Sequence, residues 1–329
     1  MPTRRRALLI LAALAGLALL SIALALMVGS VSIPFNEVLA SLFGSESGLS
    51  GDVVRSLRLP RALAGFACGG LLALAGALLQ VLLRNPLADP YVLGISGGAG
   101  VGALLAILFG FGLVGVNGSA FIGALAAMLV VFGLAHGDGS WTQTRLLLTG
   151  VIVAAGCGAA VALMLSIAPD NKLRGMLFWL MGDLSQSNDP RLVLGVLTAV
   201  LLVSLPFSRE LNLLTRGTDM AQTLGVHVTR LRRGVYLVAS LATAAAVTQA
   251  GSIGFIGLIV PHLVRLAVGN DQRLLLPASV LAGGSLLVIA DTLARSIVAP
   301  QQLPVGVLTA LIGVPVFLFL LTRDAQTGR

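Results

Sequence analysis

The chain contains ten apolar stretches, each about as long as the ~20 residues that a helix needs to cross the hydrocarbon core of a bilayer. Hydrophobic residues make up 57% of its 329 residues and charged residues only 10%, whereas a soluble domain carries about 25% charge. We therefore predict an all-α integral membrane protein, a polytopic bundle of about ten transmembrane helices that forms one domain over residues 1–329. The predicted spans are roughly 7–29, 61–83, 92–111, 119–135, 145–166, 191–207, 234–252, 253–268, 274–296 and 303–321.

Both ends of the chain are predicted to be cytoplasmic. Arg4, Arg5 and Arg6 precede the first span, and this orientation puts a two-to-one excess of Lys and Arg on the cytoplasmic side, as in most membrane proteins. A cleavable signal peptide is the alternative for the first span, but its apolar core would be ~7–15 residues and this one is about 22. The net charge of +8 is scattered through short loops. The charges therefore indicate which side of the membrane each loop occupies. We expect membrane lipid around the protein and no nucleic-acid partner.

Two apolar stretches carry residues that a simple membrane anchor does not need. The first, 84–94, contains two prolines and an aspartate; the second, 251–265, contains three glycines, Pro261, His262 and Arg265. Gly and Pro inside apolar segments mark close helix contacts, kinks or helix ends within a bundle. The three histidines are far apart in the sequence, and Cys68 and Cys157 lie in apolar segments. We expect no metal site, and we expect both cysteines to be buried.

Little of the chain is predicted to lie outside the membrane. The longest external loops are about 30–60 and 167–190, and the second includes a short amphipathic helix over 172–182. The longest cytoplasmic loop, 208–233, contains a short helix at 218–224, with Thr218 as its cap and Gly225 as its stop. This loop is either a plain connector or a docking element. The chain lacks the GxxxxGK[ST] phosphate loop, so we expect no enzyme activity and no cofactor bound directly.

Charged residues near the predicted outer surface have two interpretations. Asp291 and Arg295 are four residues apart and can pair on one helix face, while Arg58 and Arg61 flank the start of the second span. These residues are either interfacial structural groups or a dock for acidic side chains, since Arg binds carboxylates in a bidentate way. No carboxylate lies in the middle of a predicted span. That absence argues against an ion-coupled secondary transporter, which needs such groups.

The motifs resemble those of the permease subunits of ATP-binding-cassette (ABC) importers for iron–siderophores, haem and vitamin B12, the FecCD-type or type II importers. The resemblance runs from the second span to the end of the chain. The matching segments are Arg58-Leu59-Pro60-Arg61, 76–80, Asn85-Pro86-Leu87-Ala88-Asp89-Pro90, 93–100, 145–150, 179–182, 221–225, 254–262 with Arg265, Asp291 with Arg295, and 303–306.

The resemblance implies a homodimer in the bacterial cytoplasmic (inner) membrane. Two cytoplasmic ATPase subunits would bind it and use the ATP, and a periplasmic or lipoprotein substrate-binding protein would deliver the cargo. The cargo implied is first a ferric siderophore, then cobalamin, then haem. The rival classes are an ion-coupled carrier and a structural subunit without a transport path.

The resemblance also implies roles for individual residues. Arg58, Arg61 and Arg295 would dock the binding protein, and 208–233 would be the coupling loop that contacts the ATPase. Gln143 and Thr144 occupy the position of a Thr-Ser pair at the inner gate of the vitamin B12 permease. The glycines of the fifth span would line the path, although close helix packing explains them equally well. The implied coupling residues are Thr218, Asp219, Ala221, Leu224 and Gly225; the gate is Asn85, Pro86, Leu87, Gln143 and Thr144; the path is Gly150, Gly156 and Gly158; the structural motif is Pro261, His262, Arg265 and Asp291.

Overall fold

The fold is known from a computed structural model, which describes residues 4–29, 31–44, 48–135, 143–187 and 189–327. The described residues form helices, turns and loops, with no strand among them. The helices are α1 (Arg4–Met27), α2 (Phe35–Leu42), α3 (Leu49–Asp52), the π-helical η1 (Val53–Arg58), α4 (Leu59–Leu82), the 3-10 turn η2 (Pro90–Leu93), α5 (Ile95–Leu108), α6 (Leu113–Ala135), α7 (Gln143–Ile167), α8 (Asp170–Met181), α9 (Arg191–Ser204), the 3-10 turn η3 (Leu205–Phe207), α10 (Ser208–Thr215), α11 (Thr218–Thr223), α12 (Val228–Ala250), α13 (Ile256–Val268), α14 (Gln272–Ser296) and α15 (Val305–Thr327).

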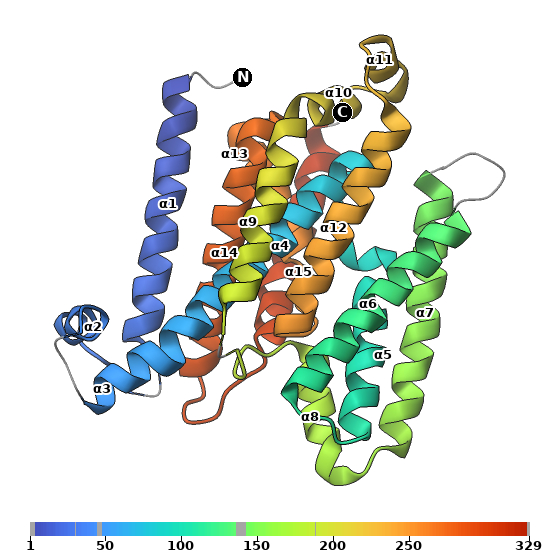
Figure 1. The fold of residues 1–329 in the computed structure, drawn as a ribbon. Coiled ribbons are helices and arrows are strands. Elements are labelled where there is room, and N and C mark those ends of the chain that lie inside the picture. The colour runs from blue at the N-terminus through green and yellow to red at the C-terminus, as the bar shows by residue number, and fades with distance from the viewer. Residues whose placement is uncertain (1–3, 30, 45–47, 136–142, 188, 328–329) are drawn as a thin grey trace.

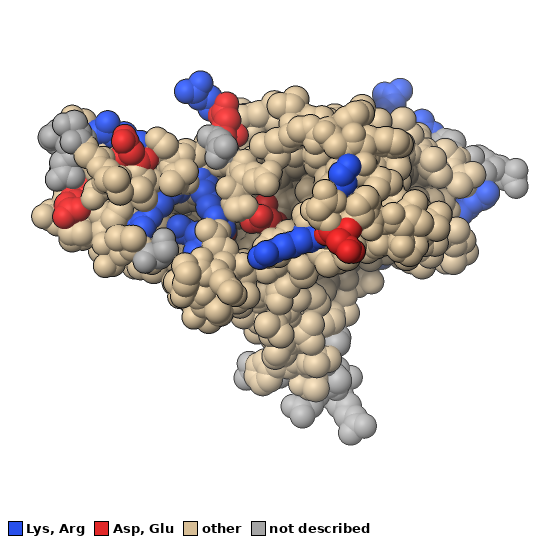
Figure 2. Space-filling model, turned by 90° about the horizontal axis from the view of Figure 1, so that it is seen from below, with Lys and Arg blue, Asp and Glu red and all other residues tan. Residues whose placement is uncertain are grey.

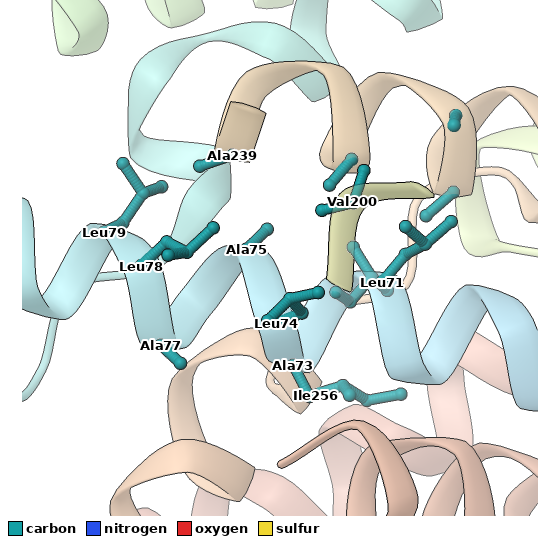
Figure 3. Packing of buried hydrophobic residues seen from close by; sticks show 14 of the residues in the cluster. Leu71, Ala73, Leu74, Ala75, Ala77, Leu78, Leu79, Val200, Ala239 and Ile256 are labelled. Atoms are coloured by element: carbon teal, nitrogen blue, oxygen red, sulfur yellow. The ribbon is translucent and has the colours of Figure 1, made fainter. Parts of the chain in front are cut away.

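Helix α4 runs through the centre of the bundle. It is apolar all round, which is typical of a helix that is covered on every side, and nearly every residue from Ala62 to Leu82 is buried. Helices α1, α9, α12, α13 and α14 pack around it (Figure 1). Figure 3 shows Leu71, Leu74 and Leu78 of α4 among side chains that include Val200 of α9 and Ala239 of α12. The main core of the protein is therefore built on one central helix.

Helices α5 to α8 form a second group beside this centre (Figure 1). Helix α5 packs on α6, α7 and α8, and α12 contacts both α5 and α6. The start of α1 and the end of α15 lie at the same end of the bundle as α10 and α11. Helices α2, α3 and α8 lie at the opposite end. One end of the bundle therefore carries α10 and α11, and the other carries α2, α3 and α8.

Each of the ten predicted spans overlaps one described helix, but the helices differ in length. Six of the described helices are long and apolar enough to cross a membrane. Three apolar helices are shorter, namely Ile95–Leu108, Ile256–Val268 and the part of α15 from Val305 to Leu320. Helix α12 is long but has Arg230, Arg232 and Arg233 near its start. The prediction of an all-α membrane bundle agrees with the structure. The number of spans that cross a bilayer stays a prediction.

Two predicted spans are shortened because the chain breaks inside them. The predicted span 92–111 begins in η2 and turns at Gly94, whose φ of 75° lies in the left-handed region that favours glycine. The predicted span 253–268 starts as a helix only at Ile256, after Phe255, whose φ is 70°. The segments 83–94 and 251–255, which lie outside the α-helices, precede these two short helices.

The two breaks bind each other. The Tyr91 hydroxyl accepts a hydrogen bond from the backbone N–H of Ile253 at 2.9 Å. The hydroxyls of Ser96 and Ser252 lie 3.0 Å apart and also pair. Non-helical backbone is tolerated at membrane depth only where its polar groups find partners in the protein. Tyr91 of the first break therefore supplies a partner for a backbone group of the second, and the serine pair joins the second break to the first turn of α5.

The region 30–60, expected to be an external loop, is largely helical. Helix α2 and the continuous stretch from Leu49 into α4 replace the predicted loop. The cause is a small apolar cluster in which Val38 of α2 and Val54 of η1 pack with Leu26 and Ile33. The short helix expected at 172–182 is present as α8.

Gly76 is expected to be essential for the contact between α4 and α13. A Cβ at Gly76 would overlap the carbonyl group of Gly257, and Pro261 has no N–H to donate to that carbonyl across a helical turn. Forcing a methyl group into a packed core costs about 1–3 kcal/mol. Gly76→Ala should therefore lower the apparent Tm of the detergent-purified protein. Gly16→Ala is the matched control because a Cβ there meets nothing. Equal Tm values for the two variants would contradict this packing.

Candidate functional site

The three arginines predicted to dock a partner line one cavity. Arg58, Arg61 and Arg295 surround a space of about 400 Å³ together with Ser185, Ser187 and Gln302. The cavity lies at the end of the bundle that carries α2 and α3, and Figure 2 looks onto this end and shows basic side chains in and around a hollow. Residues far apart in the sequence thus meet in one basic cavity.

Arg61 of α4 binds Asp291 of α14 in a bidentate way. Its Nε lies 2.9 Å from Oδ2 and its Nη2 lies 2.8 Å from Oδ1, while its Nη1 donates to Gln302 Oε1 at 2.8 Å. Charge-assisted pairs of this geometry are among the stronger hydrogen bonds in proteins. Arg295 reaches the same carboxylate, with its Nε 3.3 Å from Oδ2. The predicted pairing of Asp291 with Arg295 is confirmed, and Arg61 is a second partner from another helix.

Arg58 binds the end of α1. Its guanidinium donates to the carbonyl oxygens of Leu26 at 2.7 Å and Met27 at 3.1 Å, and also to that of Val31. The last carbonyls of a helix have no partner within the helix, so Arg58 supplies donors that α1 lacks.

The three arginines are less exposed than surface residues are expected to be. Arg58 is 5% exposed, Arg61 8% and Arg295 9%. Three guanidinium groups line the cavity, and the one carboxylate that binds any of them among the described residues is that of the buried Asp291. The cavity is therefore positively charged, although its arginines also hold the fold together. The docking role assigned to them stays a prediction.

A second, larger cavity at the same end is close to neutral. It measures about 950 Å³, and it shares Ser185, Pro300 and Gln302 with the arginine cavity. One Arg174 and one Asp183 balance each other there, and Phe178 and Trp179 add aromatic surface. The remaining polar side chains are mostly amides, namely Asn117, Asn171, Gln186, Gln249, Gln301 and Gln302. Sequence spacing does not reveal this site: the Gln301-Gln302 pair was a signal, but its amide partners come from α6, α8, α12 and the segment that follows α8.

The two segments predicted to form an inner gate are adjacent. The Gln143 side chain, at the start of α7, donates from Nε2 to the carbonyl of Leu82 at 3.0 Å, where α4 ends. The Asn85 side chain accepts from the N–H of Leu87 at 2.9 Å and so shapes the turn that contains Pro86. Thr144 is exposed. The structure therefore brings the predicted gate segments together, while gating itself stays a prediction.

The predicted coupling helix is present as α11, one residue shorter than expected. Gly225, with φ 84°, ends it as predicted. The predicted cap is wrong, because Gly217 with φ 134° is the N-cap residue and the Thr218 hydroxyl binds Asp219 Oδ1 at 3.2 Å. Ala221 is buried and Leu224 is 55% exposed. Helix α11 and the neighbouring α10 lie at the end of the bundle where α1 begins (Figure 1).

Helix α10 is fixed to the bundle by an amide. Asn212 donates to Asp271 Oδ1 at 2.9 Å, and its side-chain oxygen accepts from the N–H of Gln272 at 2.9 Å. Asp271 precedes α14 and caps it. A displacement of α10 is therefore passed directly to the start of α14.

The three glycines of α7 have different surroundings. A Cβ at Gly150 would overlap the Val92 carbonyl, so close packing accounts for that glycine. Gly156 and Gly158 are exposed and have open space around them. Most of the long apolar helix α7 is exposed in the single chain. Of these three glycines, Gly156 and Gly158 are the two whose exposed positions would suit a path along α7.

The structural motif of α13 connects it to α4. Arg265 donates from Nη2 to Gln80 Oε1 at 2.8 Å, and Gln80 donates from Nε2 to the Leu258 carbonyl at 3.1 Å. Pro261 and His262 are buried in the same helix. The Gln80 carbonyl also accepts from the N–H of Asn85. This network therefore joins α13, the end of α4 and the turn at Asn85, a link that sequence spacing alone does not indicate.

Asp291 is expected to be the most sensitive member of the arginine cavity. Asp291→Asn would leave Arg61 and Arg295 buried without their shared anion, and breaking a buried ion pair costs about 3–5 kcal/mol. The apparent Tm of the purified variant should fall well below that of Asp189→Asn, whose ion pair with Arg191 is exposed and 4.0 Å long. If both variants melt alike, the pair does not stabilise the fold.

Comparison with known proteins places the chain in a family. The profile of the FecCD transport family matches residues 7–323. The cobalamin import system permease BtuC of Halobacterium salinarum is 46% identical over 277 residues, which cover 83% of this chain and 74% of that protein. The Fe(3+) dicitrate transport permease FecC of Escherichia coli is 38% identical over 290 residues and covers 86% and 87% of the two chains.

A solved structure agrees with these relatives. An ABC transporter assigned to the metal-chelate type, in an inward-facing conformation, superposes with a TM-score of 0.83 at 32% identity. The match covers 96% of this chain and 99% of that one. Sequence and structure together show that the chain belongs to the FecCD transport family and is an ABC transporter permease.

Proposed function

We propose that this permease works as a homodimer in the bacterial inner membrane, and that it imports a metal chelate delivered by a binding protein outside the cell. The observation that carries this proposal is the arginine cavity. Three arginines and one carboxylate leave an uncompensated positive charge at the end of the bundle opposite to α11. Carboxylates on a binding protein are the natural partners of such a cavity.

The opposite end would contact the ATPase. Helix α11 presents exposed Met220 and Leu224 there, and Asn212 connects the adjoining α10 to α14. A movement of this loop when the ATPase binds ATP would shift α14, which holds Asp291 at the far end. Such a helix shift would alternate access to the path without a catalytic residue in the permease.

The path would run along α7 at the dimer axis. Helix α7 leaves Gly156 and Gly158 exposed, and α15 leaves Leu311, Leu318 and Phe319 exposed. Apolar surface of this extent on a membrane helix is covered either by lipid or by a second copy. Gln143 at the start of α7 would narrow the inner mouth beside the turn at Asn85 and Leu87.

We favour cobalamin as the cargo. The neutral outer cavity offers amides and three aromatic side chains, Phe111, Phe178 and Trp179, which suit a bulky chelate with an amide-rich periphery better than an anionic one. The relative at 46% identity imports cobalamin. The ferric siderophore that motif resemblance ranks first is the second candidate, and the iron-chelate relative supports it.

Uptake in a strain with and without this permease distinguishes the two cargoes. We expect the deletion strain to lose uptake of labelled cobalamin and to keep uptake of labelled ferric siderophore, with cobalamin uptake restored by the gene. Loss of siderophore uptake alone would make iron supply the function. Loss of neither would contradict an import role for both cargoes.

Docking is tested with Arg58→Gln, measured as the Kd of the binding protein for the permease in nanodiscs. Removing one charge from a desolvated pair is expected to weaken binding by tenfold or more, since such losses are about 2–5 kcal/mol. Arg55→Gln is the control, because Arg55 is exposed, lies on the same turn and does not line the cavity. Both variants are compared only if they keep the wild-type Tm. Equal Kd values would remove Arg58 from the docking surface.

A further inference from the structure

We infer that a cavity between α9, α10 and α12 binds phosphatidylethanolamine from the leaflet at the α11 end of the bundle. The cavity measures about 560 Å³ and has one apolar wall and one charged rim. The inference does not depend on the cargo, the dimer or the binding protein proposed above.

The apolar wall lies within one leaflet. Along α12 it runs from Leu231 to Val238. At ~1.5 Å of rise per residue this part of the helix is about 10 Å long. One leaflet is half of the ~30 Å hydrocarbon core, so the wall covers roughly two thirds of its depth. Leu78 of α4 and Val203 and Phe207 near the end of α9 complete the wall. An acyl chain would fit along its length.

The surroundings of the cavity are those of a lipid-facing surface. Leu202 is 64% exposed, Val203 51% and Phe207 49%. Large apolar side chains exposed on a long apolar helix face hydrocarbon in a membrane. Lipid therefore has access to the wall from the side.

The charged rim matches a zwitterionic head group. Arg209 and Arg230 line it, and among the described residues neither guanidinium forms an ion pair. Glu210 lines the same cavity, and its Oε2 is buried without a hydrogen-bond partner in the described chain. The arginines would bind the lipid phosphate, and Glu210 would bind the ammonium group. His227 is the other titratable residue of the rim.

A protein partner fits the cavity less well. An ATPase side chain would enter from the aqueous side, where Leu224 and Gly225 form the end of the cavity, and would leave the deeper wall at Leu78 and Val238 uncovered. It would also have to supply a cation for Glu210 and an anion for the arginines at once. Phosphatidylethanolamine carries both charges and an apolar chain in one molecule.

The first experiment fills the cavity. A Cβ at Gly234, which lines it, meets open space, so Gly234→Leu should fold and block the site. Gly195→Leu on α9 is the matched control, since it also has open space and lies outside the cavity. The readout is phosphatidylethanolamine bound per permease, measured by native mass spectrometry during titration of the delipidated protein. We expect Gly234→Leu to lose about one bound lipid and Gly195→Leu to lose none. Equal binding by both variants would overturn the site.

The second experiment tests the head group with Arg209 and Arg230, which are exposed, and with Glu210, whose change to Gln keeps the size of the side chain. Arg209→Gln with Arg230→Gln should weaken phosphatidylethanolamine binding about tenfold, which corresponds to ~1.4 kcal/mol. Arg191→Gln, at the other end of the bundle, should not. Glu210→Gln should remove the preference for phosphatidylethanolamine over phosphatidylglycerol. A wild-type preference for phosphatidylglycerol would overturn the assignment of the ammonium group to Glu210. Displacement of the bound lipid by the purified ATPase subunit would make the cavity a protein-docking site instead.

Discussion

The fold depends on the need to satisfy backbone polar groups where two helices are broken inside an apolar bundle. A membrane offers no water to the N–H and C=O groups of segments 83–94 and 251–255. Side chains of these segments meet part of the need: Tyr91 accepts from the N–H of Ile253, and Asp89 accepts from the N–H of Tyr91. Helices α5 and α13 can therefore start deep in the bundle. The glycine contact between Gly76 and Gly257 lets α4 lie close to α13.

Two ends with different chemistry are built on this centre. At one end Asp291 anchors Arg61 and Arg295, so that a cluster with excess positive charge stays ordered and largely buried. At the other end Asn212 and Asp271 fix α10 to α14. Helix α14 contributes to both ends, since it starts after Asp271 and carries Asp291 and Arg295. Side chains thus connect the start of α14 to the proposed coupling loop and its other end to Arg61 of the arginine cavity, and the proposed function uses it as the route for a mechanical signal.

The same groups contribute to stability and to the proposed function. Arg58 supplies donors to the end of α1, and Arg61 joins α4 to α14. A variant that removes either charge changes packing as well as docking, so the exposed neighbour Arg55 and the melting temperature are needed to separate the effects. The cavity between α9, α10 and α12 also reaches the proposed coupling loop, because Leu224 and Gly225 of that loop line it. A lipid bound there would contact the segment that the ATPase is proposed to move.

The amino-acid sequence by itself determined the membrane class, the places of the α-helices that overlap the predicted spans, the i, i+4 pairing of Asp291 with Arg295, and the glycine that ends α11. Each of these follows from local composition or from spacing along one helix. Only the tertiary structure decided that Arg61 shares Asp291, that Arg58 binds α1, that Gln143 meets Leu82, and that amides from separate elements form a neutral cavity. It also decided that two spans are broken and that Phe35–Leu42 and the stretch from Leu49 into α4 are helical. The reason is physical: these features depend on which surfaces meet across long sequence separations, and helical periodicity carries no record of the partner.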